Sequence, residues 1–159
     1  MNCSSVFVYG TLKKDQLRGS LWPRRPICIE PAIAQGFLWD LGTYPGLIAG
    51  DDSILGEIWT FEPFDIIQTL KALDAIEGYD PISDKGLYLR RKIDVQLLSR
   101  DEKQNPTRQC FTYIIPDIKD WPRARRIKPW IEHDPHTTFA AWPDHQSRVP
   151  RSLLEDDSP

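Results

Sequence analysis

The chain has 159 residues, which is the length of one ordinary domain. A hydrophobic fraction of 40% and a charged fraction of 27% are typical of a globular protein and exclude wholesale disorder. The formal net charge of -3 creates no basic field, so we expect no nucleic acid partner. No apolar run approaches the roughly 20 residues of a membrane span, and no signal peptide is recognisable, so we expect a cytoplasmic protein without membrane contact.

The first half of the sequence predicts strands separated by turns and loops. A long polar stretch at 11–26 predicts a loop, and the next apolar stretch predicts one or two bent strands because Pro31 and Gly36 interrupt it. Residues 42–46 predict a turn, because Pro45 followed by Gly46 suits the central positions of a type II turn. β-branched, aromatic and alternating residues predict strands at 5–9, 27–41, 47–49 and 54–61.

The second half contains the one clear helical pattern. Apolar residues recur with a period close to 3.6 over 64–76, after Pro63 and before Gly78, which stands where a glycine commonly ends a helix. A loop at 79–86 and strands at 88–98 and 108–115 complete the pattern. Many strands with one main helix indicate an α+β domain.

Beyond residue 115 the periodic pattern stops. We expect one domain over 1–115, a Trp- and Pro-rich extension over 116–150 that packs on it, and a disordered tail at 151–159. The pair His133 and His136 has neither a supporting helix nor a fourth ligand, so we expect no metal site. The three cysteines are odd in number and far apart, which indicates reduced thiols.

Two segments could carry chemistry. The first strand ends at Gly10, and such a bend can turn successive backbone N–H groups outward to hold a carboxylate or phosphate. It could equally be an ordinary strand-ending turn. Glu77 lies at the end of the predicted helix beside its apolar seam, where burial and the helix C-terminus would raise the pKa of its carboxyl group and make it a usable base. A solvated surface carboxylate would show the same pattern.

Five short pieces of the sequence form an ordered set of motifs. The pieces are Phe7-Val8-Tyr9-Gly10-Thr11-Leu12-Lys13, Tyr44-Pro45-Gly46, Gly56-Glu57-Ile58-Trp59, Leu73-Asp74-x-x-Glu77-Gly78-Tyr79-x-Pro81 and Tyr88-x-Arg90. This ordered set resembles the gamma-glutamylcyclotransferase-like superfamily, including its gamma-glutamylamine cyclotransferase and avirulence-induced-gene-like members. The resemblance covers about residues 4–115.

The resemblance implies a small mixed β-barrel with a flanking helix. It also implies a transferase or lyase reaction of glutathione or gamma-glutamylamine metabolism, in which the α-amine of a γ-glutamyl compound attacks its own γ-carbonyl. The C–N bond breaks, and 5-oxoproline and an amine or amino acid are released. By similarity Glu77 is the general acid/base. The expected substrate-binding residues are Tyr9, Gly10, Thr11, Leu12, Gly46, Tyr88 and Tyr113.

The expected cyclisation agrees with the absence of a metal-ligand cluster from the sequence. The cyclisation requires no activated water, so we expect neither metal nor cofactor. We expect Gly10 to need a positive φ, and the phenol of Tyr113 to hydrogen-bond the substrate or its oxyanion. Specificity is expected in the loops at 13–26 and 79–87. The alternative is a module on the same fold that binds a small molecule or a partner without turnover. Neither the leaving group nor the oligomeric state can be predicted.

Overall fold

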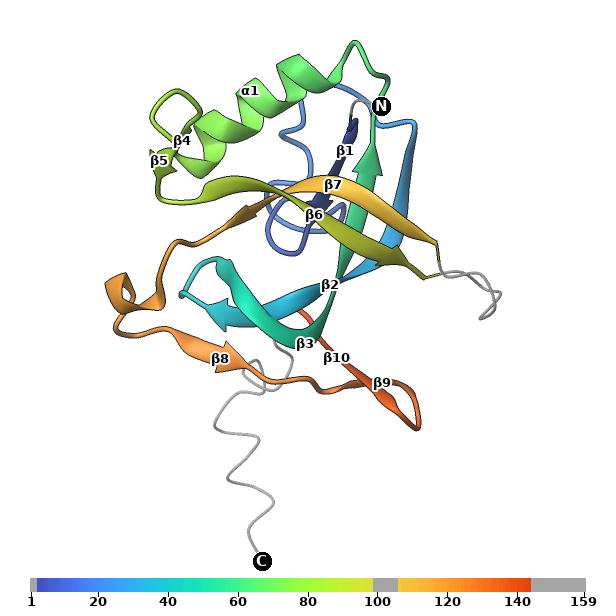
Figure 1. The fold of residues 1–159 in the computed structure, drawn as a ribbon, viewed down its shortest axis with the longest axis vertical. Helices are drawn as coiled ribbons and strands as arrows, with labels where there is room; N and C mark the ends of the chain where they lie inside the picture. The colour runs from blue at the N-terminus through green and yellow to red at the C-terminus, as the bar shows by residue number, and fades with distance from the viewer. Residues whose placement is uncertain (1–2, 99–105, 144–159) are drawn as a thin grey trace, which may run out of the picture.

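The computed structural model describes residues 3–98 and 106–143 of the chain. Its centre is a closed mixed β-barrel, in which strands β2, β6, β7, β1 and β3 follow one another and β3 pairs back with β2 (Figure 1). Its neighbouring strands are antiparallel except β1 and β7, which are parallel. The barrel strands are β1 (Ser5–Val8), β2 (Cys28–Asp40), β3 (Pro45–Thr60), β6 (Leu89–Leu97) and β7 (Thr107–Ile114). The predicted α+β fold with a small mixed barrel is confirmed.

Strand β1 is buried on both faces, which explains its unbroken apolar sequence. Successive side chains of a strand point to opposite faces. Phe7 accordingly packs into the barrel interior, while Val6 and Val8 pack in the second core beneath the helix. The loop that follows β1, residues 9–12, is called the glycine loop below. It therefore begins at a strand that is packed on both faces.

The long β2–β3 hairpin corrects two sequence predictions. The predicted strands 47–49 and 54–61 belong to one strand, whose pairing with β2 shifts register between Gly36 and Phe37. The chain reverses in the first part of the turn predicted at 42–46, where Leu41 N donates to Tyr44 O at 3.0 Å and Gly42 has a φ of 120°. The type II centre predicted at Pro45-Gly46 is wrong, because the positive φ falls on Gly42 and these two residues begin β3.

The helix α1 (Ile66–Glu77) packs over the outside of the barrel. Leu70 and Leu73 are buried against the second core, whereas Ile67, counted in the apolar seam from sequence, is 70% exposed. Gly78 ends the helix in the left-handed conformation, with φ 65° and ψ 40°, as its position predicted. The short strands β4 (Tyr79–Asp80) and β5 (Lys85–Gly86) follow at once and form a hairpin where a loop was predicted.

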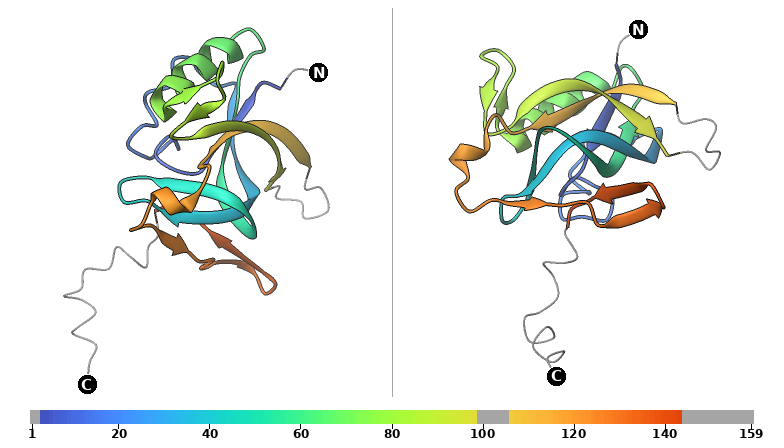
Figure 2. Two further views of the ribbon diagram at one scale, coloured as in Figure 1. Left: turned by 60° about the vertical axis from the view of Figure 1, so that its left-hand side comes forward. Right: turned by 60° about the horizontal axis from the view of Figure 1, so that its bottom comes forward.

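The segment after residue 115 adds strands to the same sheet. Strand β8 pairs with β2, β10 runs parallel to β3, and β9 pairs with β10, on the side of the barrel away from α1 (Figure 1 and Figure 2). Trp130 and Trp142 pack against the barrel core. The elements are the 3-10 helix η1 (Ile118–Asp120), β8 (Arg125–Ile127), β9 (Ile131–Asp134) and β10 (Thr137–Ala140). The tail predicted at 151–159 lies outside the described residues.

All three cysteines are free, as predicted. In the part of the chain that the structure describes, no helix is long and apolar enough to cross a membrane. The same residues contain no cluster of three or more His, Cys, Asp or Glu side chains suited to a metal ion.

Candidate active site

A cavity of about 100 Å³ lies between the loop after β1, the C-terminal end of α1 and the start of β3. It collects residues that are far apart in the sequence, and most of the predicted site residues line it. Its wall consists of Phe7, Val8, Tyr9, Gly10, Thr11, Leu12, Arg18, Tyr44, Pro45, Ile76, Glu77, Leu87, Tyr88 and Tyr113. Gly46 is absent from this wall, because its Cα faces the side chains of Ile115 and Leu41.

Three successive residues of the loop after β1, Gly10, Thr11 and Leu12, line the cavity. Within the described residues, no protein acceptor binds the N–H of Gly10, Thr11 or Leu12. Buried N–H groups rarely stay unpaired, and successive free donors form the kind of concavity that holds an anion. The predicted anion-binding loop therefore has donors available in this fold.

Gly10 is required for a different reason from the predicted one. It is not among the glycines with positive φ. A Cβ on Gly10 would instead come within 2.7 Å of Cγ and 2.8 Å of Cδ of Pro45, which is far inside van der Waals contact. The lack of a side chain allows the loop to lie directly against the first residue of β3.

The hydroxyl group of Tyr9 forms hydrogen bonds with two strands beside the cavity. It donates to the carbonyl oxygen of Tyr113 at 2.5 Å and accepts from the N–H of Leu47 at 3.2 Å. Burial raises the pKa of this phenol well above its ordinary value, so it stays protonated. Tyr9 thus lines the cavity, while its hydroxyl group connects the end of β1 to β7 and β3 by hydrogen bonds.

Glu77 is the carboxyl group of the cavity. It is the last residue of α1, and within the described residues its carboxyl group makes no hydrogen bond or ion pair. Burial raises the pKa of Glu77 from 4.5 to about 7, while the nearby positive charge of Arg18 acts in the lowering direction. A carboxyl group with this pKa can accept and return a proton near neutral pH.

Two further tyrosines line the cavity with their hydroxyl groups already engaged. The hydroxyl of Tyr88 donates to the carbonyl oxygen of Pro45 at 2.6 Å. The hydroxyl of Tyr113 donates to Oδ1 of Asp74, also at 2.6 Å. The expectation that the Tyr113 phenol is free for a substrate is therefore corrected, because buried Asp74 on α1 takes it.

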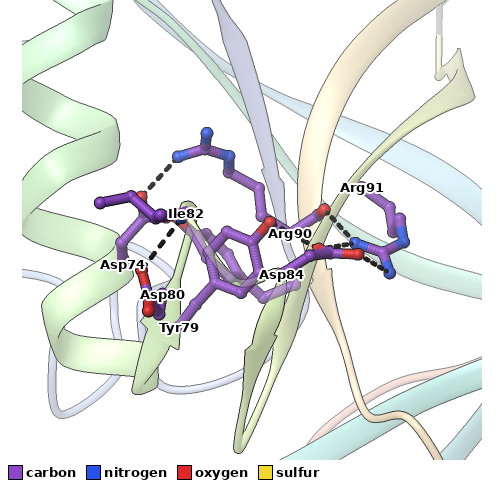
Figure 3. Close-up of polar contacts among 8 residues, drawn as sticks. Asp74, Tyr79, Asp80, Ile82, Asp84, Arg90 and Arg91 are labelled. Atoms are coloured by element: carbon purple, nitrogen blue, oxygen red, sulfur yellow. Dashed lines mark hydrogen bonds and ion pairs between the residues drawn. The ribbon is translucent and has the colours of Figure 1, made fainter.

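The sequence did not indicate two features of the site, Arg18 and the ion pair between Asp74 and Arg90. Arg18 lies in the predicted loop 11–26, where no periodicity indicates which side chain faces inward. Nη1 of Arg90 donates to Oδ2 of Asp74 at 2.6 Å, and the neighbouring Arg91 pairs with Asp84 of the β4–β5 hairpin (Figure 3). Asp74 and Arg90 both stand in the quoted motif pieces, which is the signal that could have found them.

A match to a protein-family model shows which family this chain belongs to. The family model for gamma-glutamyl cyclotransferase, AIG2-like proteins matches residues 6–133. The chain belongs to this family. The match extends beyond the 4–115 covered by the motif pieces and includes β8.

One relative shares sequence with part of this cyclotransferase-family chain. A Vibrio cholerae protein, provisionally named a gamma-glutamylcyclotransferase, is 34% identical over 76 residues. The matched segment covers 45% of this chain and 60% of the relative, so it spans about three-fifths of that protein's length. The relative supports the general kind of function, gamma-glutamyl cyclotransferase-like.

Solved structures share the family fold at low sequence identity. An AIG2-like protein of Mus musculus aligns with a TM-score of 0.59 and 22% identity, over 86% of this chain and 93% of the mouse chain. An Arabidopsis thaliana protein aligns with a TM-score of 0.51 and 21% identity, over 75% and 80%. A yeast gamma-glutamyl cyclotransferase, described as specific to glutathione, aligns with a TM-score of 0.50 and 14% identity, over 69% and 67%.

Proposed function

We propose that this protein releases 5-oxoproline from a γ-glutamyl amine or γ-glutamyl amino acid, with Glu77 as the general acid/base. One observation carries the proposal: a partly buried carboxyl group, its pKa raised to about 7, shares a small cavity with three successive residues whose N–H groups bind no acceptor among the described residues. The family membership agrees with this reaction type.

The N–H groups of Gly10, Thr11 and Leu12 would hold the α-carboxylate of the glutamyl group. Backbone donors fixed at the end of a buried strand need little reorganisation to bind an anion. With the carboxylate held there, the side chain of the glutamyl group folds back and brings its γ-carbonyl carbon to the α-nitrogen. Holding this conformer supplies much of the rate advantage of an intramolecular reaction.

Glu77 moves the proton that the cyclisation requires. The α-amine of the substrate is mostly protonated at neutral pH, because α-amino pKa values lie near 8. As a carboxylate, Glu77 accepts one proton from the ammonium group, and the freed lone pair attacks the γ-carbonyl carbon. Protonated Glu77 then donates to the departing nitrogen as the C–N bond breaks. The α-nitrogen loses a second proton as the lactam forms, and Glu77 accepts it and passes it to the released amine, which leaves as an ammonium ion. Both protons from the α-nitrogen thus end on the released amine, and Glu77 returns to its starting carboxylate form.

The direct test is 5-oxoproline release by the purified protein and by Glu77→Gln. The substrates are γ-glutamyl amino acids, γ-glutamylamines, ε-(γ-glutamyl)lysine and glutathione. Removing a general acid/base typically lowers the rate by about 10²–10⁴-fold. The rate of Glu77→Gln should therefore fall by at least about 10²-fold, while the variant stays folded. Glu62→Gln is the matched control, because Glu62 is exposed and lies outside the cavity.

Each result distinguishes the enzyme from the alternative. Release that depends on Glu77 and not on Glu62 supports the proposal, and the preferred substrate identifies the leaving group. No release from any substrate, together with ligand-induced thermal stabilisation, would favour a binding module on the same fold.

A further inference from the structure

Arg18 is a cation in the cavity wall. Among the described residues its guanidinium group forms no hydrogen bond and no ion pair, whereas Arg24, Arg90, Arg91, Arg108 and Arg126 each pair with a carboxylate. The Arg18 side chain is half-buried, so much of its surface faces protein rather than bulk water. A partly desolvated guanidinium aimed at a cavity is suited to bind a planar anion through two parallel hydrogen bonds.

The backbone fixes Arg18 relative to the glycine loop. The N–H of Arg18 donates to the carbonyl oxygen of Thr11 at 2.7 Å, and further turns through Lys13 and Gln16 brace the loop between them. Gly19 is packed so closely that a Cβ there would lie 2.3 Å from the carbonyl oxygen of Lys13. Arg18 is therefore held on a compact, internally bonded loop.

The cavity has a buried end and an exposed end. Thr11 and Leu12 are 8% and 4% exposed, whereas Leu17 beside Arg18 and Leu87 on the cavity wall are 85% and 47% exposed. Pockets for drug-sized ligands measure roughly 300–1,000 Å³. A cavity of about 100 Å³ has room for the glutamyl group alone, so the leaving group must extend to the exposed end.

We propose that Arg18 binds a carboxylate of the leaving group and selects γ-glutamyl α-amino acids over γ-glutamyl amines that lack a carboxylate. This inference rests on the proposed function, which assigns the buried N–H groups to the glutamyl carboxylate. A second anion site at the exposed end then matches the second carboxylate of a γ-glutamyl amino acid. Arg18 thereby serves as a specificity residue, distinct from the proton-transfer role of Glu77.

Two substrates that differ only in this carboxylate test the inference. γ-Glutamyl-alanine and γ-glutamyl-ethylamine have the same glutamyl group, and the second lacks only the carboxylate of the leaving group. A hydrogen bond to a charged group contributes about 1.5–3 kcal/mol, so Arg18→Gln should lower kcat/KM for γ-glutamyl-alanine by about 10–150-fold. Both values are measured at about pH 9, where Glu77 is ionised in either protein, so a change in its pKa does not enter the comparison. The value for γ-glutamyl-ethylamine should change less than about threefold. Lys14→Gln, which removes an exposed charge from the same loop, should leave both values unchanged.

The outcomes separate this inference from the proposed function. An equal loss with both substrates would place Arg18 at the glutamyl group or at Glu77 and overturn the inference, as would no loss with either. If the wild-type protein released no 5-oxoproline, the proposed function would fail. Calorimetric binding of the two compounds would still decide the role of Arg18. A preference for γ-glutamyl-alanine that disappears in Arg18→Gln supports it, and equal binding of both compounds by the wild-type protein overturns it.

Discussion

The hydroxyl group of Tyr113 donates a hydrogen bond of 2.6 Å to Asp74, one helical turn before Glu77 on α1. The second carboxylate oxygen of Asp74 accepts from Arg90 at 2.6 Å, so both oxygens of this buried group are satisfied (Figure 3 shows the ion pair with Arg90). Strands β6 and β7 thereby hold the last turn of the helix. This network anchors the turn of α1 that carries Glu77.

Tyr113→Phe should therefore affect stability more than chemistry. The variant removes one hydrogen bond to a charged group that keeps its pairing with Arg90, so the free energy of unfolding should fall by about 1.5–3 kcal/mol. The value of kcat should fall less than about tenfold, because Glu77 retains its place. Urea denaturation and steady-state kinetics measure the two effects. A kcat loss as large as that of Glu77→Gln would show that the Tyr113 hydroxyl group acts on the substrate.

The pH dependence of activity should show the raised pKa of Glu77. The carboxylate form accepts the proton, so kcat/KM should rise with pH and reach half of its maximum near the pKa of about 7. The Arg18→Gln variant should shift this midpoint to higher pH, because the positive charge of Arg18 lowers the pKa of Glu77. A pH–rate profile of each protein checks both statements. An acid limb near the ordinary value of 4.5 would contradict the buried carboxyl group.

The same pKa shift predicts how stability changes with pH. Between the ordinary value of 4.5 and about 7, the folded chain holds a proton on Glu77 that the unfolded chain has released. The free energy of unfolding should therefore fall as pH rises through this window, by on the order of 3 kcal/mol from this group. Glu77→Gln should remove the decline, making the variant more stable than wild type at about pH 8 but not at about pH 4. Urea denaturation at both pH values measures this, and parallel curves for the two proteins would contradict it.

Gly10→Ala tests the close contact between the glycine loop and β3. The added Cβ would fall within 2.8 Å of two atoms of the Pro45 ring, which cannot rotate away. Overpacking of this kind costs typically about 1–3 kcal/mol, and here it would displace the N–H groups that we propose bind the substrate carboxylate. We expect lower stability and a KM raised at least tenfold. The control is Gly42→Ala, which has free space for a Cβ but a φ of 120° that strains alanine, so it should lose stability as well. Its KM should not change, because Gly42 lies outside the cavity. Unchanged KM in Gly10→Ala would contradict the assigned role of the loop.

Local patterns predicted the parts of the site that depend on one segment. The strand before Gly10, the seam of α1 and the terminating Gly78 lie within short windows, so periodicity and capping preferences located Glu77 at a helix end. The ordered motif pieces indicated that the glycine loop and Glu77 belong to one site. The structure brings them to the same cavity.

The remaining features depend on contacts between distant segments. The partner of the Tyr113 hydroxyl lies 39 residues away on α1, and the contact of Gly10 with Pro45 depends on how β3 packs beside β1. No periodicity in the loop at 11–26 could show that Arg18 faces inward. Strands β8 to β10 were not predicted, because they are short and prolines near them obscure the alternation of apolar and polar residues. They form by pairing with distant strands, β8 with β2 and β10 with β3.

Gly78 allows a test of the helix end that leaves the cavity wall intact. Its φ of 65° costs a residue with a Cβ about 1–2 kcal/mol, whereas asparagine tolerates this conformation better. A Cβ would lie 3.5 Å from Cβ of Leu87, an ordinary contact, so the cost is one of backbone conformation and not of crowding. Gly78→Ala should therefore lower the free energy of unfolding by about 1–2 kcal/mol, and Gly78→Asn by clearly less. Both folded variants should keep kcat within a few-fold of wild type, since Glu77 precedes the substituted position. Equal destabilisation by alanine and asparagine would show that the site is limited by space, because the two residues differ little in their Cβ contact.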